Sequence, residues 1–152
     1  MGLSCLISFL ISTQLALVTP DLAKPPTLDR HPTLVRMLEE NNRQRASVGL
    51  PAQKMSLELT RAAQDHAWYM ARTGNFSHYA NGGPVARAHR YGYDGPLSEN
   101  IALGYETISG VFQGWRQSSG HWANITGRDA RAGFGFAISA DGTCYWVGMY
   151  GD

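Results

Sequence analysis

Three side chains suited to chemistry, His78, Glu99 and His121, stand in segments of small and polar residues. Glu99 precedes an apolar run at 101–103, which places it at the mouth of a short buried strand. Gly120, directly before His121, predicts a sharp turn and a close approach of the backbone to a neighbour. The three side chains come from separate segments, so only the folded chain can bring them together.

Several kinds of chemistry are open to these groups. Two neutral imidazoles and a carboxylate can bind Zn²⁺ and leave a fourth position for a water, which the metal would activate for hydrolysis. Glu99 could instead orient a histidine from outside the ligand set, or a His–Glu pair could do acid–base work without metal. A purely structural alternative is a hydrogen-bonded cluster that pins the loops. No serine stands in a recognisable nucleophile turn, and Cys144 falls within a predicted strand.

Two further histidines are predicted to lie outside this group. His66 shares a helical face with Ala62, Ala63 and Met70, so we expect a buried or supporting side chain rather than a ligand. His89 lies among arginines on a short predicted helix and is expected to face solvent.

Composition limits the class of protein. The chain has 152 residues, enough for one domain with a single core. With 43% hydrophobic and 16% charged residues it belongs with globular proteins and not with disordered ones. The formal net charge of +1 and the lack of a long basic run argue against a nucleic-acid-binding surface.

Residues 1–23 are interpreted as a signal peptide or other N-terminal leader. Residues 5–18 are uncharged and rich in Leu, Ile and Ser, and the run is shorter than the ~20 residues of a membrane-spanning helix. No Lys or Arg precedes it, so an extension or an anchor that stays attached is the alternative. We expect cleavage to leave a mature N-terminus between Leu17 and Pro26, a secreted or extracytoplasmic protein, and membrane contact only through the leader.

Residues 24–33 form a proline-rich segment that predicts an extended linker, and residues 34–152 form the domain. Without the leader, Cys144 is the only cysteine, which excludes an intrachain disulfide. We expect Cys144 to behave as a small buried apolar residue.

Four helices are predicted, at 33–45, 57–73, 84–91 and 110–118. The clearest is the second, which Ser56 caps and Gly74 ends. Thr33 and Ser109 are the candidate caps of the first and the last helix.

The C-terminal part predicts a β-hairpin. Apolar residues alternate over 133–139, a favoured Asp-Gly turn follows at 141–142, and the chain returns over 143–150. Both faces of the returning strand are apolar, so helices should cover both. The predicted fold is therefore α+β, a three-layer α-β-α sandwich around a central antiparallel sheet.

The order of short motifs resembles the CAP superfamily, also called the SCP or PR-1-like domain, in its short bacterial form. The resemblance covers residues 34–150. Its motifs are Asn42-x-x-Arg45, Gly49-Leu50-Pro51, Ala62-Ala63-Gln64-x-His66-Ala67, Phe76-Ser77-His78, Ser98-Glu99-Asn100-Ile101-Ala102, Trp115, Gly120-His121-x-Ala123-Asn124-Ile125 and the Gly-Phe-Gly of the hairpin.

The resemblance implies a cleft lined by two histidines and two acids, which holds a divalent metal in some members. By position these are His78, His121 and Glu99; Ser118 stands where some members carry the second acid. With one carboxylate, the expected cofactor is weakly and reversibly bound Zn²⁺ rather than Ca²⁺. The match of Asn42 and Arg45 suggests that they tie the first helix to the domain body.

Members of the superfamily bind lipids or sterols, act through protein partners, or have been proposed as hydrolases. The function that we expect is therefore an extracellular ligand-binding or metal-binding module with a His/Glu cleft. The ligand would be a lipid, a cell-envelope component or a protein. The alternative is a metal-dependent, peptidase-like hydrolase that uses His78, Glu99 and His121. The sequence does not give the oligomeric state.

Overall fold

The computed structural model describes residues 27–152. The predicted leader, its cleavage site, Cys5 and residues 24–26 of the predicted linker lie outside this range. Within it, no helix is long and apolar enough to cross a membrane.

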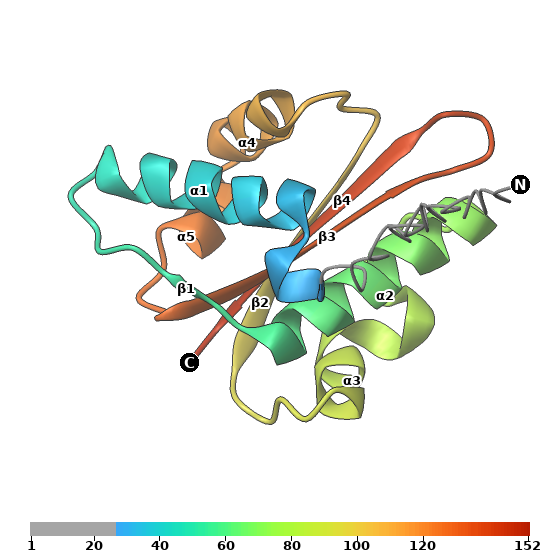
Figure 1. The fold of residues 1–152 in the computed structure, drawn as a ribbon, viewed down its shortest axis with the longest axis horizontal. Helices are drawn as coiled ribbons and strands as arrows, with labels where there is room; N and C mark the ends of the chain where they lie inside the picture. The colour runs from blue at the N-terminus through green and yellow to red at the C-terminus, as the bar shows by residue number, and fades with distance from the viewer. Residues whose placement is uncertain (1–26) are drawn as a thin grey trace, which may run out of the picture.

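Helices and strands alternate irregularly along the chain (Figure 1). In order they are η1 (Leu28–Arg30), α1 (Pro32–Ala46), β1 (Lys54–Met55), α2 (Leu57–Thr73), η2 (Ala80–Gly82), α3 (Gly83–Arg90), β2 (Leu97–Leu103), α4 (Ile108–Gln117), α5 (Ser119–Ile125), β3 (Arg131–Ile138) and β4 (Cys144–Gly151).

The strands form one four-stranded sheet in the order β1-β3-β4-β2. β4 pairs antiparallel with β3, as the hairpin pattern predicted, and also pairs antiparallel with β2 on its other side. The short edge strand β1 runs parallel to β3, so the sheet is mixed rather than wholly antiparallel. Two backbone bonds hold this edge, from Lys54 N to Ala130 O and from Ser56 N to Ala132 O, both 2.9 Å. A two-residue strand has no hydrophobic periodicity, which is why the sequence did not predict it.

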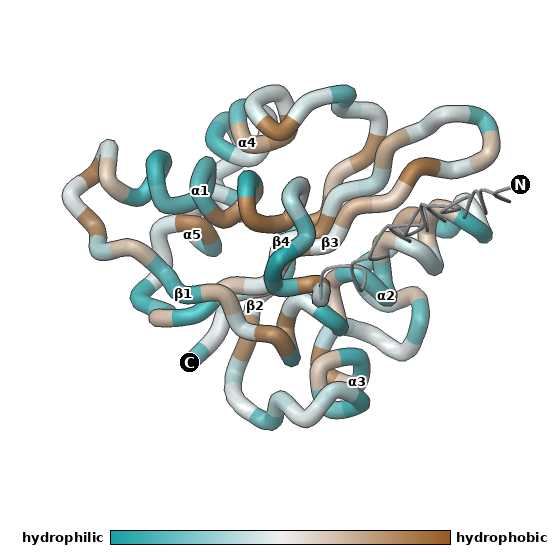
Figure 2. Tube along the Cα trace, viewed as in Figure 1, coloured by the Kyte–Doolittle hydropathy of each residue, from teal (hydrophilic) through white to brown (hydrophobic). Residues whose placement is uncertain are grey.

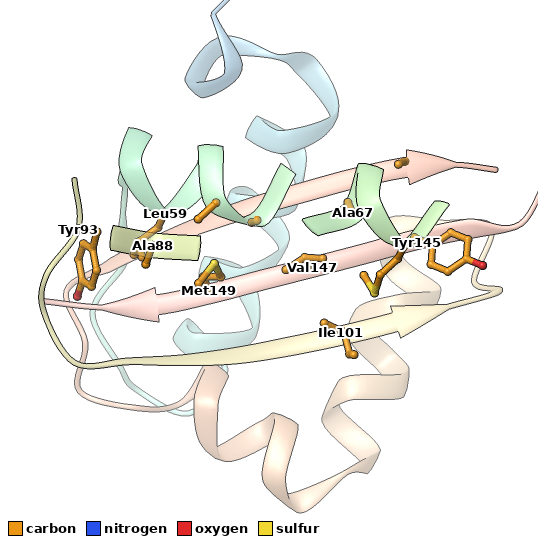
Figure 3. Close-up of a cluster of buried hydrophobic side chains, with 12 residues drawn as sticks. Leu59, Ala67, Ala88, Tyr93, Ile101, Tyr145, Val147 and Met149 are labelled. Carbon is orange, nitrogen blue, oxygen red and sulfur yellow. The ribbon is translucent and has the colours of Figure 1, made fainter. Parts of the chain in front are cut away.

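The sheet lies between two helical layers, which confirms the predicted α-β-α sandwich (Figure 1). α2 and α3 cover one face, while α1, α4 and α5 cover the other. β4 supplies side chains to both cores in alternation. Tyr145, Val147 and Met149 pack under α2 (Figure 3), whereas Trp146 and Tyr150 pack under the other layer.

Helix α2 packs directly on the β3 backbone. A Cβ on Gly133 would lie 2.3 Å from backbone atoms of Leu59 and Thr60, and one on Gly135 would lie 2.3 Å from Ala63 O. Only glycine permits this approach. Ser56 caps α2 by accepting from Leu59 N at 3.2 Å, as predicted. Hydrophobic and hydrophilic residues follow each other at short intervals along both the helices and the strands (Figure 2).

The N-terminal part differs from the predicted linker. Leu28–Arg30 is a turn of 3-10 helix, and Leu28 packs against the core below α1. Helix α1 then begins at Pro32 with His31 as its N-cap, instead of beginning after Thr33. Proline suits the first helical position because its missing N–H would have no partner there.

Two corrections concern α4 and α5. Thr107, not Ser109, caps α4, by accepting from Gly110 N at 3.0 Å. The predicted turn at Gly120 is wrong, because Gly120 lies inside α5, a helix that the sequence did not predict. The predicted close approach is also absent, since no non-neighbouring atom lies within 4 Å of where a Cβ on Gly120 would be. The chain instead bends at Ser118, whose backbone is extended.

Asn42 and Arg45 connect α1 to the body of the domain. The Arg45 guanidinium is 2% exposed and donates to three backbone carbonyls, those of Pro51, Ile125 and Gly127, at 2.7 to 2.9 Å. The Asn42 amide exchanges two bonds with the Gln53 backbone, at 2.9 and 3.0 Å. Cys144 is a free thiol, half-buried at the start of β4 rather than fully buried.

Candidate functional site

Glu99 lies in the middle of the candidate site. It belongs to β2 and pairs with Met149 of β4, and its carboxylate is 1% exposed. One oxygen, Oε1, lies 2.9 Å from His78 Nδ1. The other, Oε2, accepts from Arg87 Nη2. Both oxygens are therefore engaged, as a buried carboxylate requires.

Arg87 is the site residue that sequence reasoning missed. It lies on α3, fully buried, and besides Glu99 it binds the backbone carbonyls of His78, at 3.2 Å, and of Ala80. It thus holds both the carboxylate and the loop that carries the histidine. Its place in a run of basic residues resembled a solvated helix face. The one sequence feature that could have indicated its burial was the adjacent apolar residue Ala88, which is also buried.

The His78 ring is 41% exposed, so it can be reached from solvent. When neutral, a ring whose Nδ1 donates its proton to a carboxylate carries a free lone pair on Nε2. Its loop is fixed from a second side, since Asp65 Oδ2 accepts from Asn81 Nδ2 and from Arg90 Nη2, both at 3.0 Å. Tyr79 does not cover the ring, because 86% of its own surface is exposed.

His121 reaches the same region from the other helical layer. It lies on α5, half-buried, and its backbone carbonyl accepts from Asn100 Nδ2 at 3.0 Å. Asn124 donates in turn to Asn100 Oδ1 at 2.8 Å, which ties α5 to the strand that carries Glu99. Burial lowers the pKa of His121, and the nearby charge of His78 lowers it further. At neutral pH, His121 is therefore an uncharged base.

His66 lies beneath this cluster, as the helical pattern predicted. It is fully buried and stacks on Tyr69 with ring centroids 6.3 Å apart. Burial lowers its pKa to about 4, against an opposing effect of Glu99. The Ser77 backbone also faces the ring, yet within residues 27–152 neither ring nitrogen has a partner in hydrogen-bonding geometry. His89, by contrast, is exposed as expected.

A pocket of about 380 Å³ opens beside His121. It is mostly apolar, and its lining residues are Phe76, Ile101, Ala102, Leu103, Tyr105, Gly114, Trp115, Ser118 and His121. Three of its large apolar side chains, Phe76, Leu103 and Tyr105, are 39 to 42% exposed and form its rim. A surface that leaves such groups in water is typical of a binding site.

Gly114 shapes one wall of this pocket. A Cβ at that position of α4 would lie 2.2 Å from the Tyr105 hydroxyl oxygen, so Tyr105 rests directly on the helix backbone. Ser118, at the expected place of a second acid, also lies on the wall. The pocket lining therefore carries His121 and the hydroxyls of Ser118 and Tyr105 but no carboxylate.

Among residues 27–152, no group of three or more His, Cys, Asp or Glu side chains could hold a metal ion. Glu99 is bonded to His78 and Arg87 and its side chain is 1% exposed, whereas the two imidazoles are more accessible. A carboxylate bonded to the Nδ1 atom of a histidine has the arrangement of a group that orients that histidine.

One protein-family model matches most of the chain. The model of the CAP family, described as the cysteine-rich secretory protein family, matches residues 38–150. The chain belongs to the CAP family. No curated protein matches it significantly.

Solved structures share the CAP fold at low identity. An outer surface protein from Borrelia burgdorferi is 20% identical with a TM-score of 0.71, over 78% of this chain and 90% of that one. An extracellular SCP-domain protein from Bacillus anthracis is 22% identical with a TM-score of 0.68, over 79% and 40% of the two chains. A cysteine-rich secretory protein from Staphylococcus aureus is 16% identical with a TM-score of 0.62, over 78% and 37%. This CAP domain therefore spans less than half of the last two proteins.

Proposed function

We propose that this CAP-domain protein is an extracytoplasmic binding module whose ligand places an apolar part in the pocket beside His121. Its polar group would face His121 and Ser118. The observation that carries the proposal is the pocket itself, a mostly apolar hollow of about 380 Å³ with exposed aromatic groups at its rim and a neutral imidazole on its wall. Sites for small amphipathic ligands have this composition. Of the ligand classes considered, a lipid-like molecule suits it best.

The location outside the cytoplasm is part of the proposal. It is supported by the apolar leader in the sequence and by the names of the structural relatives, which are described as outer surface, extracellular and secretory proteins. The family description also names secretory proteins.

Hydrolysis by Glu99 is less well supported than binding. A general base must lie within reach of the proton that it takes, but the Glu99 side chain is 1% exposed and both its oxygens already accept hydrogen bonds. Glu99 instead positions His78. A zinc ion, weakly and reversibly bound, would be held by His78 and His121 and by water or ligand atoms, with Glu99 outside its ligand set.

Titration with a fluorescent fatty-acid analogue, dansylated undecanoic acid, tests the proposal. We expect saturable binding that Leu103→Glu weakens at least tenfold, since a carboxylate on the rim repels the probe's own and makes the pocket polar. Val48→Glu is the matched control, because Val48 is comparably exposed at 47% but lies outside the pocket lining. Equal loss in both variants, or no binding by the unchanged protein, would contradict the proposal.

A further inference from the structure

A second apolar surface lies away from the His78 site, between the C-terminal half of α2 and the end of β3. A hollow of about 540 Å³ separates these two elements, with Trp68, Ala71 and Arg72 on the helix side and Ile138 and Ser139 on the strand side. Trp68 is 49% exposed and Ile138 57% exposed. Large apolar groups exposed together in this way indicate an interaction surface.

Along this surface, part of the β3 edge has no neighbouring strand among residues 27–152. Within residues 27–152, no strand pairs with β3 on its β1 side beyond Ala132. Gln64 covers one position of that edge, because its side-chain amide donates to Phe136 O at 2.8 Å and accepts from Phe136 N at 3.1 Å. Backbone groups point to the same edge at every second residue, so those of Ile138 face the hollow just beyond the part that Gln64 covers. An edge of this kind is a site for association.

Two opposite charges accompany the hollow, one in its lining and one directly beside it. Arg72 lies on the α2 side, and no salt bridge of residues 27–152 includes it. Asp141 lies on the hairpin side, next to the lining residues Ser139 and Ala140. The hydroxyl of Ser139 holds the pKa of the Asp141 carboxyl below its usual value, so it is ionised at neutral pH. A two-fold rotation that exchanges the two sides would bring each cation to an anion.

We propose that a second copy of this chain docks on this surface with two-fold symmetry. Trp68 of each copy packs on Ile138 of the other, and Arg72 of each copy meets Asp141 of the other. The surface is self-complementary, as an isologous interface must be. Its helix side carries Trp68 and Arg72, and its strand side carries Ile138, with Asp141 next to the lining. A small apolar acid bound in the hollow would explain the presence of Arg72, but it would not explain Asp141 beside the strand side.

Analytical ultracentrifugation over a wide concentration range tests the dimer. The protein is purified in the form that the producing cells accumulate. We expect a concentration-dependent dimer. Arg72→Glu and Asp141→Arg should each raise the dimer dissociation constant about tenfold or more, because each charge acts twice in a symmetric interface. The double variant Arg72→Glu/Asp141→Arg should return to within about threefold of the unchanged protein, since the pairs are restored in reverse.

Trp68→Glu should abolish the dimer, while Val85→Glu, at a site 52% exposed on α3, should leave it unchanged. Circular dichroism would establish that each variant is folded. A monomer at all concentrations would overturn the proposal, and so would a double variant no better than the single ones. A monomer that instead bound the fatty-acid probe through Trp68 would assign the hollow to a small ligand.

Discussion

Arg87 and Glu99 form an ion pair that is closed to solvent on both sides, with side chains 0% and 1% exposed. The pair joins α3 to the edge strand β2, and through Glu99 it fixes the Nδ1 side of His78. The position of the His78 ring therefore depends on a buried ion pair that solvent does not reach.

Removing Arg87 should be costly. Arg87→Leu leaves the Glu99 carboxylate buried without its cation, and we expect the free energy of unfolding to fall by about 3–5 kcal/mol. Urea unfolding at neutral pH measures this. The double variant Arg87→Leu/Glu99→Leu should lose less than the single variant, because no unpaired charge remains. Single and double variants of equal stability would contradict this account of the pair.

Arg45→Ala should destabilise the fold without affecting the site. Its guanidinium serves three backbone carbonyls on two loops, so we expect a loss of about 3 kcal/mol. Arg43→Ala is the matched control, since Arg43 pairs only with Glu40 and its side chain is 66% exposed. That change should cost at most about 0.5 kcal/mol. An unchanged melting temperature in Arg45→Ala, or loss of zinc binding in it, would count against this role.

His66 should make the fold sensitive to acid. Its pKa is about 4 in the fold, against about 6.5 in the unfolded chain. The unfolded state therefore binds more protons between pH 6.5 and 4, and stability falls as the pH is lowered through that window, by up to about 3 kcal/mol. Unfolding free energies measured across this range should show a smaller fall in His66→Leu. A slope identical in both proteins would mean that His66 does not titrate as described.

Zinc binding should depend on both His78 and His121. Calorimetric titration at neutral pH should show weak, reversible binding of Zn²⁺ in preference to Ca²⁺, lost in His78→Ala and in His121→Ala. Glu99→Gln should only reduce it, because Glu99 acts through His78. Binding should weaken as the pH falls below about 6.5, where a histidine of ordinary pKa protonates.

His89→Ala is the control for the zinc titration, as that ring is 53% exposed and its ion-pair partner is Asp94. If the double histidine variant bound zinc as well as the unchanged protein, or if nothing bound at neutral pH, the three residues would form a structural cluster.

Much of the fold was predictable because its signals are local. Ser56 and Gly74 define α2, and the alternation on both sides of Asp141-Gly142 defines the hairpin, each within a few residues. Helix α5 was not predicted, because seven residues with an early glycine carry little helical periodicity. Its position is set by bonds of His121 and Asn124 to residues of β2.

The site was predictable only in part. His78, Glu99 and His121 were found as residue types in a family pattern, but the role of Glu99 was left open between ligand and supporting group. The contact that bears on this role is with Arg87, which is 12 residues away in sequence and meets Glu99 through the packing of α3 on the sheet. A buried arginine surrounded by exposed basic residues has no periodic signal, so sequence patterns do not reveal it.

The central claim is the location of the ligand pocket, and chemical-shift mapping tests it most directly. Undecanoic acid would be added stepwise to ¹⁵N- and ¹³C-labelled protein while backbone amide, histidine ring and Trp indole signals are followed. We predict saturable shifts at Leu103, Tyr105, Trp115 and His121, with the Trp68 and Ile138 signals unchanged. Shifts centred on Trp68 and Ile138, or no saturable shift at the His121 pocket, would contradict the account.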